Sequence, residues 1–112
     1  MRNNLSIINV YKKRNIKSEI VTQLLYGDTF SIKKRDKKWL KIKNNIDNYK
    51  GYIINKQFLS NQTFSHKVSS RSASLYSEPL NEKKIKKKLT FGSRIKIKKK
   101  TRSFCKFDKL WV

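Results

Sequence analysis

Few residues in this sequence could carry out covalent chemistry. The chain has one Cys, Cys105, and one His, His66. A cysteine nucleophile needs a base within hydrogen-bond reach, and His66 lies at the edge of a Ser-rich stretch far from Cys105 in the sequence. We therefore expect Cys105 to be a small buried hydrophobic residue and His66 to lie at the surface or at the start of a strand. One Cys and one His also make no Cys/His zinc site, so we expect neither a metal nor a cofactor.

A second group of candidates is the stretch DNYKGYI, which holds Asp47, Tyr49 and Tyr52. A tyrosine offers an apolar ring and a polar hydroxyl, so it can cover an ammonium group or pack against a core. From the residues alone, the simplest interpretation is a hairpin whose tyrosines pack on the body of the domain.

Trp39 is the third kind of candidate. Together with Tyr11 and Tyr26 it could line an exposed groove for a peptide. Aromatic residues on a small β-domain are more often partly buried packing, so both interpretations stay open.

The charge of the chain is large and evenly spread. There are 29 Lys and Arg against 7 Asp and Glu among 112 residues, a formal net charge of +22. The excess of Lys, Asn and Ile is typical of an AT-rich genome, which would add lysine to any protein. The physical alternative is a polyanionic partner such as nucleic acid, because lysines near phosphates release counterions.

An internal repeat organises the sequence. Sliding the chain by 65 positions needs no gap between Val10 and Ile42 and matches the following pairs: Tyr11 with Tyr76, Leu24 with Leu89, Gly27 with Gly92, and Lys41 with Lys106. A repeat at fixed spacing predicts two copies of one small module. We place them at residues 1–58 and 66–112, with a linker at 59–65.

The local pattern in each copy indicates strands. In FSIK and in RIKIK, apolar and polar residues alternate, which predicts one buried face that includes Phe30 and Ile32. Gly27 and Gly92 each follow an aromatic residue and precede a strand, where a glycine permits a sharp turn with positive φ. About five short strands per copy predict an all-β chain with two small barrels, since closure removes exposed strand edges.

The second copy is shorter at its C-terminal end. Aligning LWV with GYI places Val112 near Ile53, so INKQFL has no counterpart. We expect this copy to be truncated, to lack its closing strand, and to have an open edge near residues 85–89.

The order of these motifs resembles that of bacterial SH3 (SH3b) domains. QLLYGDTFSI with WLKIK and DNYKGYI is similar to the N-terminal SH3b module of bacterial dipeptidyl-peptidases, and SHKVSS, SLYSEP and LTFGSRIKI resemble their second module. These enzymes are NlpC-type gamma-D-glutamyl-L-diamino-acid endopeptidases that cut peptidoglycan peptides. The resemblance implies two tandem SH3-like β-barrels. It covers none of the catalytic domain, whose DCSG-like motif does not occur here, so we expect a chain that is not an enzyme.

The resemblance also implies where a ligand binds. In such peptidases the first SH3b module leans over the catalytic cleft and helps to recognise the free amino end of the substrate. Tyr49 is the residue that suits this role best, and we expect Asp47, Tyr52 and Trp39 to belong to the same ligand-binding region. The partner would be a peptidoglycan peptide or a C-terminal peptidase domain, which is missing here.

The rival hypothesis is a basic SH3-like barrel that binds nucleic acid, with Trp39 and tyrosines stacking on bases. No apolar run approaches the roughly 18 residues of a membrane span, and the N-terminus lacks the apolar region of a secretory signal. A cytoplasmic location is therefore the expectation.

Overall fold

The computed structural model describes residues 1–60 and 62–112, and it is all-β, as predicted. The chain divides into two compact units, Met1–Asn61 (unit 1) and Gln62–Val112 (unit 2). The described residues contain twelve strands and one short 3-10 helix. In these two ranges no helix is long and apolar enough to cross a bilayer.

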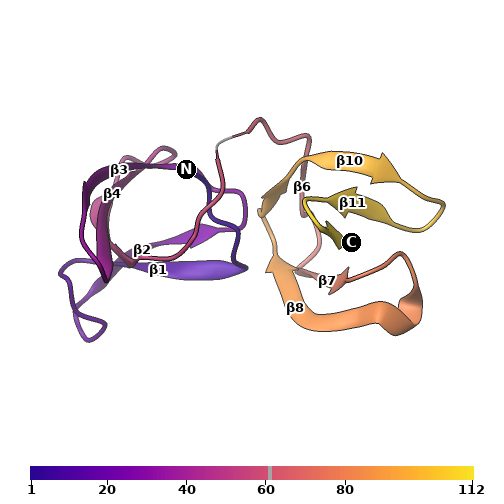
Figure 1. Ribbon diagram of the computed structural model, residues 1–112, viewed down its shortest axis with the longest axis horizontal. Coiled ribbons are helices and arrows are strands. Elements are labelled where there is room, and N and C mark those ends of the chain that lie inside the picture. The colour runs from indigo at the N-terminus through magenta and orange to yellow at the C-terminus, as the bar shows by residue number, and fades with distance from the viewer. Residues whose placement is uncertain (61) are drawn as a thin grey trace. The chain divides into compact units, whose positions relative to one another are not determined.

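Unit 1 is a five-stranded antiparallel sheet that curves around its own core (Figure 1). Its strands are β1 (Ile7–Tyr11), β2 (Ile20–Leu25), β3 (Phe30–Arg35), β4 (Trp39–Asn44) and β5 (Lys50–Ile54), in the spatial order β2-β1-β5-β4-β3. Arg2 forms isolated bridges to Thr29 and to Leu59, which ties the ends of the unit to the sheet. The sheet is consistent with an SH3-like barrel.

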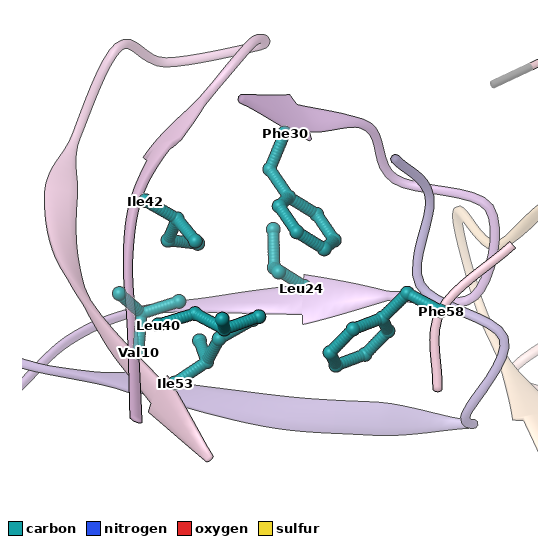
Figure 2. Close-up of a cluster of buried hydrophobic side chains, with 7 residues drawn as sticks. All are labelled: Val10, Leu24, Phe30, Leu40, Ile42, Ile53 and Phe58. Carbon is teal, nitrogen blue, oxygen red and sulfur yellow. The ribbon is translucent and has the colours of Figure 1, made fainter. Parts of the chain in front are cut away.

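The core of unit 1 lies inside this curve. Figure 2 shows its seven buried side chains converging from several strands, namely Val10, Leu24, Phe30, Leu40, Ile42, Ile53 and Phe58. Ile32 packs against this cluster, so the predicted inner face of the alternating strand is confirmed. Phe58 comes from the segment after β5, and its ring meets that of Phe30 edge-on at 5.2 Å between centroids.

Unit 2 repeats the strand order of unit 1. Its elements are β6 (His66–Lys67), β7 (Ser72–Tyr76), η1 (Asn81–Lys83), β8 (Lys84–Thr90), β9 (Arg94–Ile95), β10 (Ile97–Lys100), β11 (Cys105–Phe107) and β12 (Leu110–Trp111). The five-stranded sheet has the order β10-β11-β12-β7-β8, and β6 pairs with β9. The β6–β9 pair of Lys67 with Arg94 stands 65 positions after the bridge of Arg2 with Thr29.

The prediction that the second copy lacks its closing strand is wrong. β12 is only two residues long, yet it pairs with both β11 and β7. Val112 also exchanges two backbone hydrogen bonds of 2.9 Å with Cys105. The missing equivalent of INKQFL therefore affects mainly the segment after the strand, since only Ile54 of this stretch belongs to β5. In unit 1 that segment supplies Phe58 to the core.

Cys105 is another difference from expectation. The thiol is free and its residue is half-buried rather than buried. The reason is its position, because it is the first residue of β11, next to the turn from β10, between Lys100 and Val112. The buried apolar residues of unit 2 are Val68, Leu75, Leu89, Ile95, Phe107 and Trp111.

The two predicted glycine turns are present. Gly27 and Gly92 have φ of 83° and 86°, the left-handed region that favours glycine. Their amide N–H groups donate to the carbonyls of Asn3 and Val68 at 2.8 and 2.9 Å. These acceptors are also 65 positions apart, so the two turns are held in the same way.

Each end of the predicted linker, residues 59–65, is hydrogen-bonded to a unit: the first end to unit 1 and the last end to unit 2. The amide of Arg2 donates to the carbonyl of Leu59 at 2.9 Å, and the amide of Ser65 donates to that of Ile95 at 2.9 Å. Within this range, residue 61 lies outside the described residues.

Candidate ligand-binding site

A hollow of about 90 Å³ lies on the outer face of unit 1. It is lined by Arg14, Lys34, Asp36, Trp39, Lys41 and Tyr52. Sites for whole drug-sized molecules measure ~300–1,000 Å³. The hollow therefore has room for one end group of a larger ligand.

Strand pairing builds this site as a row across four strands. Lys34 on β3 pairs with Lys41 on β4, Lys41 pairs with Tyr52 on β5, and Tyr52 pairs with Tyr11 on β1. Directly paired residues project from the same face of a sheet. We call these four residues the basic-aromatic row.

The register of the row depends on a bulge in β3. The pairing shifts between Ile32 and Lys34, so that Ile32 faces Ile42 in the core while Lys34 faces Lys41 outside. Bulges are a common way to re-aim a side chain next to a site. Like charges directly opposite each other are destabilising, so the pair of Lys34 and Lys41 is a cost that an anion would relieve.

Aromatic rings form the wall beside these lysines. Trp39 is 8% exposed and meets Tyr11 edge-on, with ring centroids 5.9 Å apart and an interplanar angle of 90°. The guanidinium of Arg14 lies over the ring of Tyr52, 5.7 Å from its centroid. Trp39 is thus held from one side and presents only part of its ring to the hollow.

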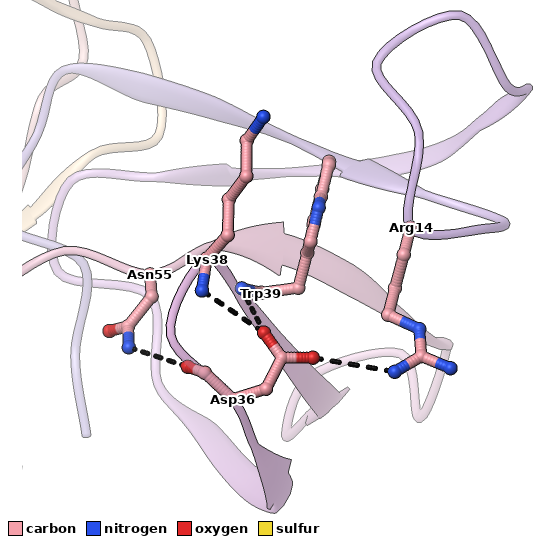
Figure 3. Close-up of polar contacts among 5 residues, drawn as sticks. All are labelled: Arg14, Asp36, Lys38, Trp39 and Asn55. Atoms are coloured by element: carbon pink, nitrogen blue, oxygen red, sulfur yellow. Dashed lines mark hydrogen bonds and ion pairs between the residues drawn. The ribbon is translucent and has the colours of Figure 1, made fainter.

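Asp36 is the one carboxylate of the hollow, and its oxygens are already engaged. Figure 3 shows Oδ1 accepting hydrogen bonds from the amides of Lys38 and Trp39 at 3.0 and 2.7 Å, while Oδ2 lies 3.3 Å from Nη1 of Arg14. The Trp39 amide is the main reason why the pKa of Asp36 is lowered from its ordinary value. Asp36 therefore stays ionised and pairs with Arg14. The positive charge that remains in the hollow comes from Lys34 and Lys41, which suits an anionic group.

The structure separates the four residues predicted to bind ligand. Trp39 and Tyr52 line the same hollow. Asp47 and Tyr49 lie in the turn between β4 and β5, at the opposite end of that hairpin from the pair of Trp39 with Ile54.

Asp47 shapes the turn that it occupies. Its Oδ1 accepts from the amide of Tyr49 at 3.0 Å, and its Oδ2 accepts from the hydroxyl of Thr22 at 3.3 Å. Tyr49 is 56% exposed, so its ring is free to meet a partner.

Sequence reasoning missed four residues of the hollow: Arg14, Lys34, Asp36 and Lys41. One signal was available, because alternation in WLKIK puts Lys41 on the same outer face as Trp39. The partner of Asp36, Arg14, comes from the loop between β1 and β2 and has no local signature.

Neither Cys105 nor His66, the two residues considered for covalent chemistry, lines the hollow. His66 is exposed at the start of β6, as expected, and its Nδ1 lies 2.8 Å from the hydroxyl of Ser65. In the described part of the chain, no group of three or more His, Cys, Asp or Glu residues could hold a metal ion.

Comparison with known families identifies unit 1. The pattern of the bacterial SH3 domain matches residues 4–60, just over half of the chain. The protein belongs to the bacterial SH3 domain family, whose members are binding or targeting modules. No curated protein matches the chain.

Proposed function

We propose that this protein is the non-catalytic binding region of an NlpC-type cell-wall peptide hydrolase and that unit 1 binds acidic groups of peptidoglycan peptides. One observation carries the proposal. Lys34 and Lys41 lie opposite each other beside an aromatic wall, while the only carboxylate of the hollow is occupied by Arg14 and backbone amides.

The chemistry of this ligand fits the hollow in both charge and size. A carboxylate between Lys34 and Lys41 would accept charge-assisted hydrogen bonds, which are about twice as strong as neutral ones. The rings of Trp39 and Tyr52 would cover the short aliphatic part of the same residue. A stem peptide offers such carboxylates on small, flexible residues.

Tyr49 has a separate part in this proposal. Its exposed ring lies on the β4–β5 turn, away from the hollow. A ring with a hydroxyl at its tip suits the free amino end of a peptide held against a peptidase domain. In this arrangement Tyr49 acts together with a catalytic partner, whereas the hollow acts alone.

We further propose that unit 2 is a second bacterial SH3 module. The shared strand order and the two glycine turns at the same spacing support this assignment. So does the edge-on ring pair of Tyr76 with Phe104, which stands 65 positions after that of Tyr11 with Trp39. Tandem modules would orient a hydrolase on its polymer.

The second candidate function is nucleic-acid binding, which the net charge of +22 favours. The site itself favours it less. Base stacking needs an open aromatic face, and Trp39 is 8% exposed.

Co-sedimentation with purified peptidoglycan tests the proposal. Lys41→Gln should weaken binding about tenfold, because it removes one charge-assisted contact. Lys17→Gln removes the same charge from the exposed β1–β2 loop, outside the hollow, and should change binding little.

Two results would reject the proposal in favour of general polyanion binding. One is an equal effect of Lys41→Gln and Lys17→Gln. The other is complete competition by oligothymidylate together with a steep fall of binding with salt, the signature of counterion release.

A further inference from the structure

We propose that unit 2 carries a second binding site for the same acidic ligand, formed by Tyr76, Lys99, Phe104, Lys106 and Trp111. The inference rests on the proposed function of unit 1, and it adds a site and a stoichiometry that the family match to residues 4–60 does not cover.

The basic-aromatic row recurs in unit 2, strand for strand. Lys99 on β10 pairs with Lys106 on β11, Lys106 pairs with Trp111 on β12, and Trp111 pairs with Tyr76 on β7. The bulge recurs too, since the register of β10 shifts between Ile97 and Lys99. Two lysines again lie opposite each other at a cost to the fold, in a unit with a smaller apolar core.

The aromatic wall recurs with changed residues. The rings of Tyr76 and Phe104 meet edge-on, with centroids 4.9 Å apart at 76°. The ammonium of Lys106 lies 5.7 Å from the centroid of the Trp111 ring. A cation therefore borders the aromatic ring of β12, as Arg14 borders Tyr52 in unit 1.

Unit 2 has a threonine where unit 1 has Asp36, and this threonine keeps the turn without the carboxylate. Thr101 stands 65 positions after Asp36, and its hydroxyl accepts a hydrogen bond from the amide of Phe104 at 3.1 Å. The corresponding position for Arg14 is Pro79, so the acid and its basic partner are both replaced. The positive charge of Lys99 and Lys106 remains without a carboxylate in the turn.

The second site lacks the neighbouring turn of the first. β11 and β12 are joined by only Asp108 and Lys109, so Asp47 and Tyr49 have no counterpart. Unit 2 should therefore bind an acidic group without the contact proposed for the amino end. Two linked sites on a repetitive polymer raise overall binding through effective concentration.

The two tryptophans provide one reporter in each unit, since Trp39 and Trp111 are the only ones in the chain. The experiment is an NMR titration of the full chain, labelled with ¹⁵N-tryptophan, using a disaccharide-tripeptide fragment of peptidoglycan. Both indole signals should shift with saturation. Lys99→Gln, at an exposed position, should weaken the Trp111 response about tenfold and leave the Trp39 response unchanged.

Lys87→Gln on β8 is the matched control, because Lys87 is exposed and lies outside the row. A shift of Trp39 alone would overturn the second site and leave the proposed function standing. Equal effects of Lys99→Gln and Lys87→Gln would also overturn it. If neither indole responds, the proposed function itself fails.

Discussion

Asp36 and Trp39 hold each other through two reciprocal hydrogen bonds. The Trp39 amide donates to the Asp36 carboxylate at 2.7 Å, and the Asp36 amide donates to the Trp39 carbonyl at 3.0 Å. The pair closes the β3–β4 hairpin and fixes the strand that carries the aromatic wall. Thr101 and Phe104 close the equivalent hairpin of unit 2 in the same way, at 3.1 and 2.8 Å.

Replacement of Asp36 should therefore affect the hairpin in a graded way. Asp36→Ala removes both side-chain acceptors and should lower the melting temperature of unit 1. Asp36→Thr places in unit 1 the hydroxyl that unit 2 uses and should restore part of the loss. Thermal unfolding followed by Trp39 fluorescence, in a Trp111→Phe background, measures both. Identical melting temperatures for wild type and both variants would show that the side-chain acceptor does not matter.

Asp36 should also make stability depend on pH. Its pKa is lower in the folded state than its ordinary value of 3.8, chiefly because of the Trp39 amide. The carboxylate therefore stabilises unit 1 above pH 3.8, and this contribution is lost as the pH falls through the folded pKa. In urea titrations, the difference in unfolding free energy between wild type and Asp36→Asn should shrink in acid. A difference that stays constant would contradict this.

Gly51 is required by close packing rather than by its backbone angle. A Cβ at this position would lie 2.6 Å from Cγ1 of Val10 and 2.7 Å from the carbonyl oxygen of Tyr11. Gly51→Ala should reduce the unfolding free energy of unit 1 by about 1–3 kcal/mol, as overpacking does. Urea unfolding of the variant and wild type measures the change. Leu110 occupies the equivalent position in unit 2, so Leu110→Ala is the informative control. If Gly51→Ala lowered the unfolding free energy by less than the experimental error, β1 would have shifted to make room for the added Cβ, which would contradict close packing at this position.

The two units should unfold in separate transitions. Leu24 and Leu89 are both fully buried and stand at equivalent positions of the repeat. Truncating a buried leucine to alanine costs about 2–5 kcal/mol, so Leu24→Ala should unfold unit 1 early and Leu89→Ala unit 2. Trp111→Phe and Trp39→Phe backgrounds let fluorescence follow each unit alone. A single shared transition in both variants would contradict independent units.

Local patterns in the sequence predict the fold well. Period-2 alternation identifies the inner face with Phe30 and Ile32, and an aromatic residue followed by glycine identifies the turns at Gly27 and Gly92. Such signals depend on neighbours in sequence. The short strand β12 has little alternation of its own and is stabilised by pairing on both sides, so local pattern alone does not show that it closes the sheet.

The site is harder to predict because it depends on register. The bulge after Ile32 places Lys34 opposite Lys41, and no residue type in that segment predicts the bulge. The contact between Arg14 and Asp36 joins two loops that come together only when the sheet forms. Residue type and the family resemblance point to Trp39 and Tyr52, and the hollow brings them together with charges that neither signal could place.

The central claim is that the hollow of unit 1 recognises an acidic group, and blocking that group tests it most directly. The indole signal of Trp39 is followed while the protein is titrated with a peptidoglycan tripeptide and with the same peptide carrying amidated carboxyl groups. The account predicts saturable shifts with the free acid and at least about tenfold weaker binding of the amide. Equal affinity for the two peptides would contradict recognition by Lys34 and Lys41.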